Sequence, residues 1–247
     1  MQTITIVNAS TVIRDKEVHS SIKSFQKQID RDFLPAWGNL TVPCKLEYVS
    51  SDTIFHTPSD QWPIAKDSWP IFINRHSTDE GALGWHDDDI SQNFPVHGRV
   101  FAGDCLLYGL KWTVTLGHEI LELMTDPNIT RVFKLSNQPH PDTYAAFEVC
   151  DAVESDDQAY NIYGVPMTNF VLPSYFGNRQ SSKYDFLGTL KGPCPALTPG
   201  GYMSLLVNGK WTQVQMDRKA GLAGRRALAR TYRRAMRMHN EIEIMTV

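Results

Sequence analysis

Apolar residues recur along the first part of the chain with two different periods, which predict its helices and strands. Residues 2–8 alternate in the manner of a strand. From about Glu17 to Trp37, apolar positions return every three or four residues, which is typical of an amphipathic helix. Segments rich in β-branched and aromatic residues predict further strands at residues 44–50, 69–77 and 99–107. Residues 79–98, rich in Gly, Asp, Asn and Pro, predict a long loop.

The second half of the chain predicts one further core helix, followed by short strands and hairpins. The helix runs from about Lys111 to Thr125, and Asp126-Pro127 ends it because a residue before proline avoids helical backbone angles. Residues 200–214 predict a hairpin, since Asn208-Gly209 supplies the positive φ angles of a type I′ turn. The resulting order of elements predicts an α+β fold.

Composition and charge divide this fold into an acidic body and a basic tail. With 42% hydrophobic and 21% charged residues, the 247-residue chain is typical of a globular protein. No run of 18 apolar residues and no secretory signal is present, so we expect no membrane contact. The four cysteines are far apart, which favours reduced thiols in a cytoplasmic setting over disulfides.

The predicted tail is strongly basic, in contrast to the rest of the chain. Residues 217–240 carry eight Lys or Arg against Asp217 alone, a charge of +7, which leaves −10 for the rest of a chain whose net charge is −3. We predict a domain over residues 1–215 and a basic helical tail over residues 216–247. Arginines recur there at helical spacing: Arg226, Arg230, Arg233, Arg234 and Arg237. Such a stripe suits an acidic protein partner or nucleic-acid phosphates, with a solvated helix as the alternative.

The predicted core helix contains the sequence HEILE, which suggests a metal site. His118 and Glu122 are four residues apart and therefore share a helix face, where both can bind one ion. Zinc accepts imidazole and carboxylate ligands, and a catalytic site keeps a position open for water. Glu119 then occupies the place of the general base in metallopeptidases of the HExxH type. The alternative is a core helix whose glutamates form a solvated face.

Further ligands are expected from other parts of the chain. Glu148 and Asp151 lie in the acidic stretch EVCDAVESDD, and one of them is the candidate third ligand. Asp126, eight residues after His118, lies on the same side of the helix and could be a ligand itself or hydrogen-bond one. His86, in GWHDDD, lies in a loop that could reach the metal or support a ligand, although an ordinary surface histidine is the favoured interpretation there.

Several motifs together resemble a family of phage and prophage proteins labelled as metallopeptidases. In family order they are DFLPAWG (32–38), ALGWHD (82–87), GRVFAG (98–103), HEILELMTDP (118–127), FEVCDAVE (147–154), GVPMTNFVLPSYF (164–176), YDF (184–186), PGGYMSLLV and GKWTQV (199–214). The chain departs from the pattern at Gly117 and Ala152, neither of which is a candidate ligand.

The resemblance implies a phage origin and a zincin-like fold, with an active-site helix packed on a small mixed sheet, β-hairpins after it and the basic helix at the end. The site residues that it implies are His118, Glu119, Glu122, Asp126, Glu148 and Asp151.

Two functions follow as hypotheses. The first is a metal-dependent hydrolase, of peptidase type, that acts on polypeptides with Glu119 as base and with Zn²⁺ favoured over Ca²⁺ or Mn²⁺. The second is a virion protein that keeps the fold without turnover and docks on a phage structural protein through its basic helix. The expected location is the host cytoplasm during infection or the virion.

Overall fold

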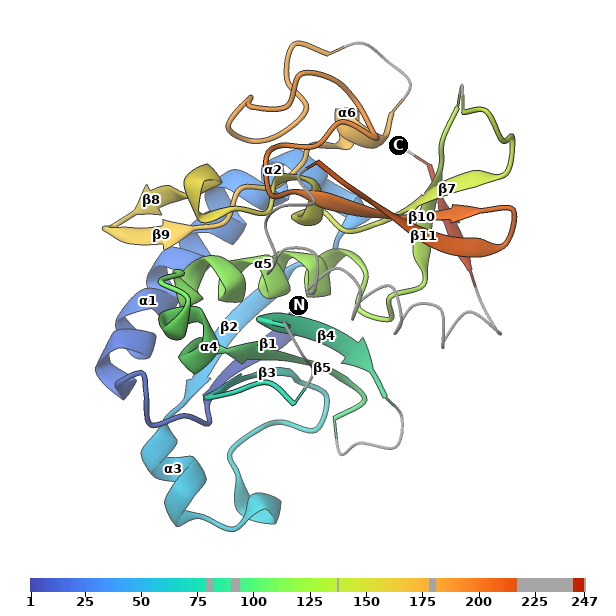
Figure 1. Ribbon diagram of the computed structural model, residues 1–247. Coiled ribbons are helices and arrows are strands. Elements are labelled where there is room, and N and C mark those ends of the chain that lie inside the picture. The colour runs from blue at the N-terminus through green and yellow to red at the C-terminus, as the bar shows by residue number, and fades with distance from the viewer. Residues whose placement is uncertain (79–81, 90–93, 137, 178–180, 217–241, 247) are drawn as a thin grey trace. The chain divides into compact units, whose positions relative to one another are not determined.

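The fold combines helices with mixed and antiparallel sheets, which confirms the α+β class (Figure 1). The computed structural model describes residues 1–78, 82–89, 94–136, 138–177, 181–216 and 242–246. The contacts divide the chain into two compact units. The first unit comprises Met1–Thr78, Leu83–Pro127 and Tyr160–Met167, and the second comprises the described parts of Asp79–Ala82, Asn128–Ala159 and Thr168–Val247. Among the described residues, no helix has the length and apolar character needed to cross a membrane.

A five-stranded mixed sheet forms the framework of the first unit. Its strands, in spatial order, are β2 (Cys44–Val49), β1 (Gln2–Asn8), β3 (Trp69–Asn74), β5 (Val96–Phe101) and β4 (Gly84–Asp88). The first four strands run parallel, and β4 lies antiparallel to β5 at the edge. In β1, every residue from Ile4 to Asn8 is buried, as is typical of a strand covered on both faces in a parallel sheet.

The helical stretch after β1 begins earlier than predicted and changes its winding. It consists of α1 (Asp15–Lys27), a π-helical segment (Gln28–Phe33), α2 (Leu34–Trp37) and a 3₁₀ turn (Gly38–Leu40). Gly38 takes a φ of 49°, which favours glycine and ends α2 where the sequence predicts. A smaller apolar cluster joins Val7 and Val49 to Ile54 of α3 (Ser51–His56) and to Ile64, beyond a 3₁₀ turn at Ser59–Gln61.

The remaining elements of the first unit are the predicted core helix and its neighbours. α5 (Trp112–Thr125) agrees with the prediction and packs on β4 and β5. The short helix α4 (Ala102–Leu107) precedes it, and the hairpin of β8 (Tyr160–Ile162) and β9 (Val165–Met167) completes the unit.

The second unit is built on a sheet with the order β11-β10-β7-β6-β12. These strands are β11 (Lys210–Gln215), β10 (Tyr202–Val207), β7 (Thr143–Ala146), β6 (Arg131–Lys134) and β12 (Glu243–Met245). All neighbours are antiparallel except β6 and β12. The predicted hairpin is confirmed, since Asn208 and Gly209 have φ angles of 50° and 75° between β10 and β11.

Aromatic rings form part of the core of the second unit. Phe133 stacks on Phe176 of α6 (Pro173–Phe176), with ring centroids 4.5 Å apart, and meets Phe147 edge-on at 4.8 Å. Along the chain, β7 is followed by two 3₁₀ turns, Asp151–Val153 and Asp156–Gln158, before the strand β8 of the first unit begins.

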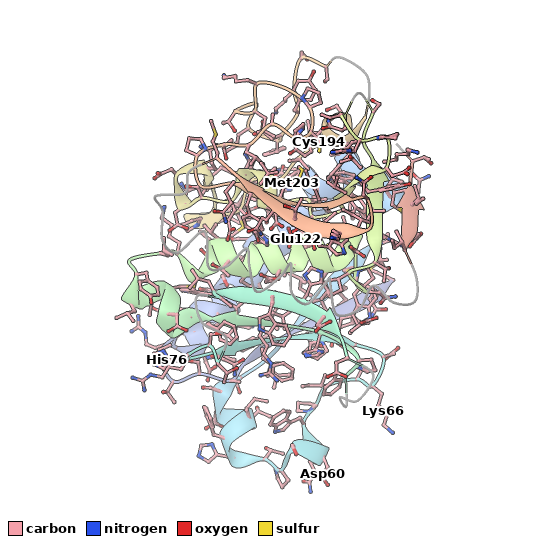
Figure 2. The ribbon with its side chains drawn as sticks, turned by 45° about the vertical axis from the view of Figure 1, so that its right-hand side comes forward. Asp60, Lys66, His76, Glu122, Cys194 and Met203 are labelled. Atoms are coloured by element: carbon pink, nitrogen blue, oxygen red, sulfur yellow. The ribbon has the colours of Figure 1, made fainter. Side chains whose placement is uncertain are left out.

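All four cysteines are free thiols, as predicted. In the second unit, the Cys194 thiol contacts the Met203 sulfur at 3.3 Å (Figure 2). Burial raises the pKa of Cys194 to about 12 and that of Cys44 in the first unit to about 12 as well. These two thiols therefore stay protonated at neutral pH and serve as packing groups.

Several predicted elements are wrong or lie outside the described residues. The predicted loop 79–98 contains β4, and the predicted strand 99–107 ends at Phe101, where α4 follows. The C-terminal residues Glu243–Met245 form a strand, because they pair with β6, instead of continuing a helix. Residues 217–241, including the arginine stripe of Arg226, Arg230, Arg233, Arg234 and Arg237, lie outside the described residues. The helix and the domain boundary predicted there stay predictions.

Candidate metal centre

The helix α5 buries charged groups together with its apolar ones. His118, Glu119 and Glu122 have relative exposures of 2%, 0% and 0%. The neighbouring Leu116 and Ile120 are as deeply buried, which explains why the segment forms a core helix. The interpretation of the two glutamates as a solvated face is therefore wrong. Buried carboxylates need compensation by a donor, a proton or a cation, so this helix is a candidate site.

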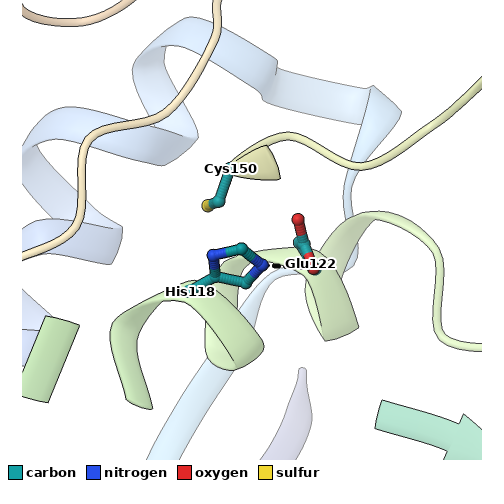
Figure 3. A group of neighbouring side chains, drawn as sticks. All are labelled: His118, Glu122 and Cys150. Carbon is teal, nitrogen blue, oxygen red and sulfur yellow. Dashed lines mark ion pairs between the residues drawn. The ribbon is translucent and has the colours of Figure 1, made fainter. Parts of the chain in front are cut away.

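His118 and Glu122 meet on one face of α5, as their spacing predicts. The His118 Nε2 atom and the Glu122 Oε2 atom are 2.9 Å apart (Figure 3). One helical turn separates the two side chains, so both can reach one ion at the usual zinc–ligand distances of about 2 Å. The imidazole does not face aliphatic side chains alone, which would have ruled out a ligand role.

His86 belongs to the same buried cluster, although the sequence favours a surface position for it. It lies on β4, and its Nδ1 atom is 3.4 Å from the Glu119 Oε2 atom. Its Nε2 atom is 3.1 Å from the main-chain carbonyl oxygen of Asp126, where α5 ends. His86 is 5% exposed. The surface interpretation is wrong because β4 pairs with β5 and turns alternate residues toward α5.

The close approach of β4 to α5 depends on Gly84. This residue precedes His86 by two positions and shares its side of the strand. A Cβ atom at Gly84 would stand 2.6 Å from the Glu119 Oε1 atom and 2.9 Å from the Thr115 Cγ2 atom. Glycine therefore leaves the space that the Glu119 carboxylate occupies. Once β4 is known to be a strand, the spacing of two residues puts Gly84 and His86 on one side, but the polar sequence GWHDD does not by itself predict that strand.

The donor types of the cluster suit a divalent metal ion. One ligand atom each from His86, Glu119 and Glu122 lies within 4.8 Å of the other two. Imidazole nitrogen and carboxylate oxygen are the usual ligands of Zn²⁺ and also suit Mn²⁺. The first unit thus contains two neighbouring arrangements of ligands on α5, the His118–Glu122 pair and this triad, and Glu122 belongs to both.

The other predicted ligands have different surroundings. Asp126 is fully buried, but the contact with His86 comes from its carbonyl oxygen, so a ligand-supporting role for its side chain stays a prediction. Glu148 and Asp151 lie in the second unit, both buried, where Asp151 begins a 3₁₀ turn. Their role as third ligand stays a prediction.

Comparisons of the chain with protein-family models, with curated proteins and with solved structures found no match.

Proposed function

We propose that the protein is a metal-dependent hydrolase of the peptidase class that uses His118 and Glu122 as metal ligands and Glu119 as general base. The observation that carries this proposal is the 2.9 Å approach of His118 Nε2 to Glu122 Oε2 in a fully buried position, with Glu119 beside them. A zincin-like arrangement is part of the proposal. The packing of α5 on the edge of a mixed sheet supports it.

Each residue has a defined task in this proposal. A divalent metal ion, when bound, supplies Lewis-acid activation of water. His118 and Glu122 hold the ion through one imidazole nitrogen and one carboxylate oxygen. The Glu119 carboxylate accepts a proton from the water molecule and later returns it to the leaving amine. Its burial on a rigid helix keeps the carboxylate oriented without a cost at the moment of reaction.

The decisive experiment measures cleavage of an unfolded polypeptide such as denatured casein. Wild-type protein is stripped with a chelator and reloaded with Zn²⁺, Mn²⁺ or Ca²⁺, and the rate is compared with that of Glu119→Gln. We expect the variant to bind metal yet to lose about 10²- to 10⁴-fold in rate, the usual contribution of a general base. Equal cleavage rates in wild type and Glu119→Gln would rule out the proposed enzyme, in which Glu119 is the general base.

A matched control separates the loss of the base from a general loss of fold. Glu47→Gln makes the same chemical change on β2 of the first unit, where the Glu47 side chain is 47% exposed and pairs with Lys45. This variant should keep the wild-type rate. If the wild type binds metal but cleaves nothing with any of the three ions, the hypothesis of a virion protein without turnover is favoured.

A further inference from the structure

Each ring nitrogen of His86 faces an oxygen atom, the Asp126 carbonyl oxygen at Nε2 and Glu119 Oε2 at Nδ1. This arrangement restricts what can lie between His86 and Glu119. The Asp126 carbonyl can only accept a hydrogen bond, so the 3.1 Å contact assigns the ring proton to Nε2. A neutral ring then directs the lone pair of Nδ1 toward the Glu119 Oε2 atom. A lone pair and a carboxylate oxygen repel one another, so either a proton or a metal cation must join them.

The distance between these two atoms favours the metal cation. Nδ1 and Oε2 are 3.4 Å apart, beyond the range of about 2.7–2.9 Å for a charge-assisted hydrogen bond. Two ligands of a tetrahedral ion, each bound at about 2.1 Å, stand roughly 3.4 Å apart. Metal-binding histidines also commonly donate their second ring N–H to a backbone carbonyl, as His86 does to Asp126.

Glu122 supplies a third ligand, and the charge and burial of the cluster also suit a cation. Glu122 has a carboxylate oxygen within 4.8 Å of the ligand atoms of both His86 and Glu119. The side chains of His86 and Glu119 are 2% and 0% exposed, and Glu122 is 0% exposed. The negative charge of two carboxylates at this depth would balance the charge of a divalent ion. One imidazole and two carboxylates are a ligand set for Zn²⁺ or Mn²⁺.

We infer that His86 Nδ1, Glu119 and Glu122 form a second divalent-cation site, next to the one proposed at His118 and linked to it through Glu122. This inference rests on the proposed function only through that shared carboxylate. It also has a consequence for the reaction. A cation bound by one Glu119 oxygen lowers the basicity of that carboxylate, so an ion at the second site should slow hydrolysis without abolishing it.

The test is a count of bound Zn²⁺ per chain by elemental analysis, after reloading the stripped full-length protein and dialysing it. We expect His86→Gln to hold one ion fewer than wild type, His118→Gln to hold one fewer, and Glu122→Gln to hold two fewer. His56→Gln is the matched control, because the His56 side chain is 74% exposed. It should hold the wild-type number. Ions bound adventitiously at surface histidines cancel in these differences.

The alternative outcomes separate the inference from the proposed function. A wild-type count that falls in His118→Gln but not in His86→Gln overturns the second site and leaves the proposed ligand pair in place. A count that falls in His86→Gln but not in His118→Gln supports the second site and removes the proposed ligand pair. Unchanged counts in both variants overturn both.

A measurement on wild-type protein covers the case in which His86→Gln fails to fold. Long-range ¹H–¹⁵N NMR of the histidine side chains should show the proton of His86 on Nε2, and Zn²⁺ should shift the Nδ1 resonance. An Nδ1 resonance that stays unchanged at saturating Zn²⁺ overturns the inference.

Discussion

In the first unit, Asp15 and the two glutamates of α5 differ in the kind of partner that surrounds their carboxylates. At the start of α1, Asp15 accepts hydrogen bonds from Asn8 Nδ2, from the Ser51 amide and from the Ser51 hydroxyl, each at 2.8 Å, and from the Tyr48 hydroxyl. On α5, the nearest charged or titratable neighbours of Glu119 and Glu122 include the imidazoles of His86 and His118.

This difference separates a structural carboxylate from the two that we propose act in catalysis and metal binding. Partial burial alone would raise the pKa of Asp15, but hydrogen bonds from Ser51, Tyr48 and Asn8 outweigh it and hold that pKa well below its ordinary value. These donors keep their protons throughout the neutral range. An imidazole can donate, accept or bind metal, depending on where its proton lies. Asp15 therefore holds elements together, whereas the imidazoles beside Glu119 and Glu122 can change their hydrogen-bonding role or bind an ion, as the proposed chemistry requires.

The largest effect on stability is expected at Asp15. Asp15→Ala leaves the donors of Asn8, Ser51 and Tyr48 without their acceptor, and each such loss costs on the order of 1 kcal/mol or more. We expect the free energy of unfolding to fall by about 3 kcal/mol, measured by urea denaturation of metal-free protein at neutral pH. Asp60→Ala, on an exposed 3₁₀ turn, should change it by less than about 0.5 kcal/mol. Equal effects at both positions would contradict a structural role for Asp15.

Local sequence signals predicted the elements that depend on nearby residues. The strand β1, the end of α5 before Asp126-Pro127 and the Asn208-Gly209 turn need only neighbours along the chain, and all three are confirmed. The spacing of His118 and Glu122 is equally local, and their approach is confirmed.

Elements that depend on distant partners were missed. The strand β4 has the polar sequence GWHDD, and it forms because it pairs with β5, so no apolar alternation reveals it. The burial of His86 follows from that pairing and could not be read without it. The bonds of Asp15 join residues up to 36 positions apart, which no local pattern encodes.

The second largest effect is expected at Gly84, which allows β4 to approach α5. Gly84→Ala places a methyl group 2.6 Å from the Glu119 Oε1 atom, and the overpacked site should lose about 2 kcal/mol of unfolding free energy. Calorimetry of the metal-free protein would measure this loss of unfolding free energy. Gly192→Ala is the matched control, because the nearest atom to a Cβ there is 3.9 Å away. If Gly84→Ala and Gly192→Ala lose the same unfolding free energy, the close approach of β4 to Glu119 does not require glycine at position 84.

A smaller effect concerns the acid dependence of stability. Because the pKa of Asp15 is lower in the folded chain than its ordinary value near 4, its contribution is complete above about pH 4 and is lost as the pH falls toward the folded pKa. Asp15→Asn removes this titration. The difference in unfolding free energy between wild type and Asp15→Asn should therefore be about 1–2 kcal/mol at pH 6 and should shrink below about pH 4.

Urea denaturation at pH 6, 4 and 2.5 measures this difference, with Asp60→Asn as the control. A difference that stays constant over the whole range would mean that the charge of Asp15 contributes nothing and that only its shape matters.

The smallest effect on the metal-free protein is expected where the chemistry is proposed. The double variant His118→Leu, Glu122→Met replaces a buried polar pair by apolar side chains of similar size, a change that often leaves stability unaltered or raises it. We expect the unfolding free energy of the metal-free double variant to lie within about 1 kcal/mol of wild type. Zn²⁺ should stabilise the wild type by about 2.7 kcal/mol at one hundred times its dissociation constant and the double variant by less. A loss above about 3 kcal/mol of unfolding free energy in the metal-free double variant would instead make His118 and Glu122 a structural pair, like Asp15 and its donors. Replacing a structural pair lowers the stability of the metal-free protein, whereas replacing a pair that serves to bind an ion does not.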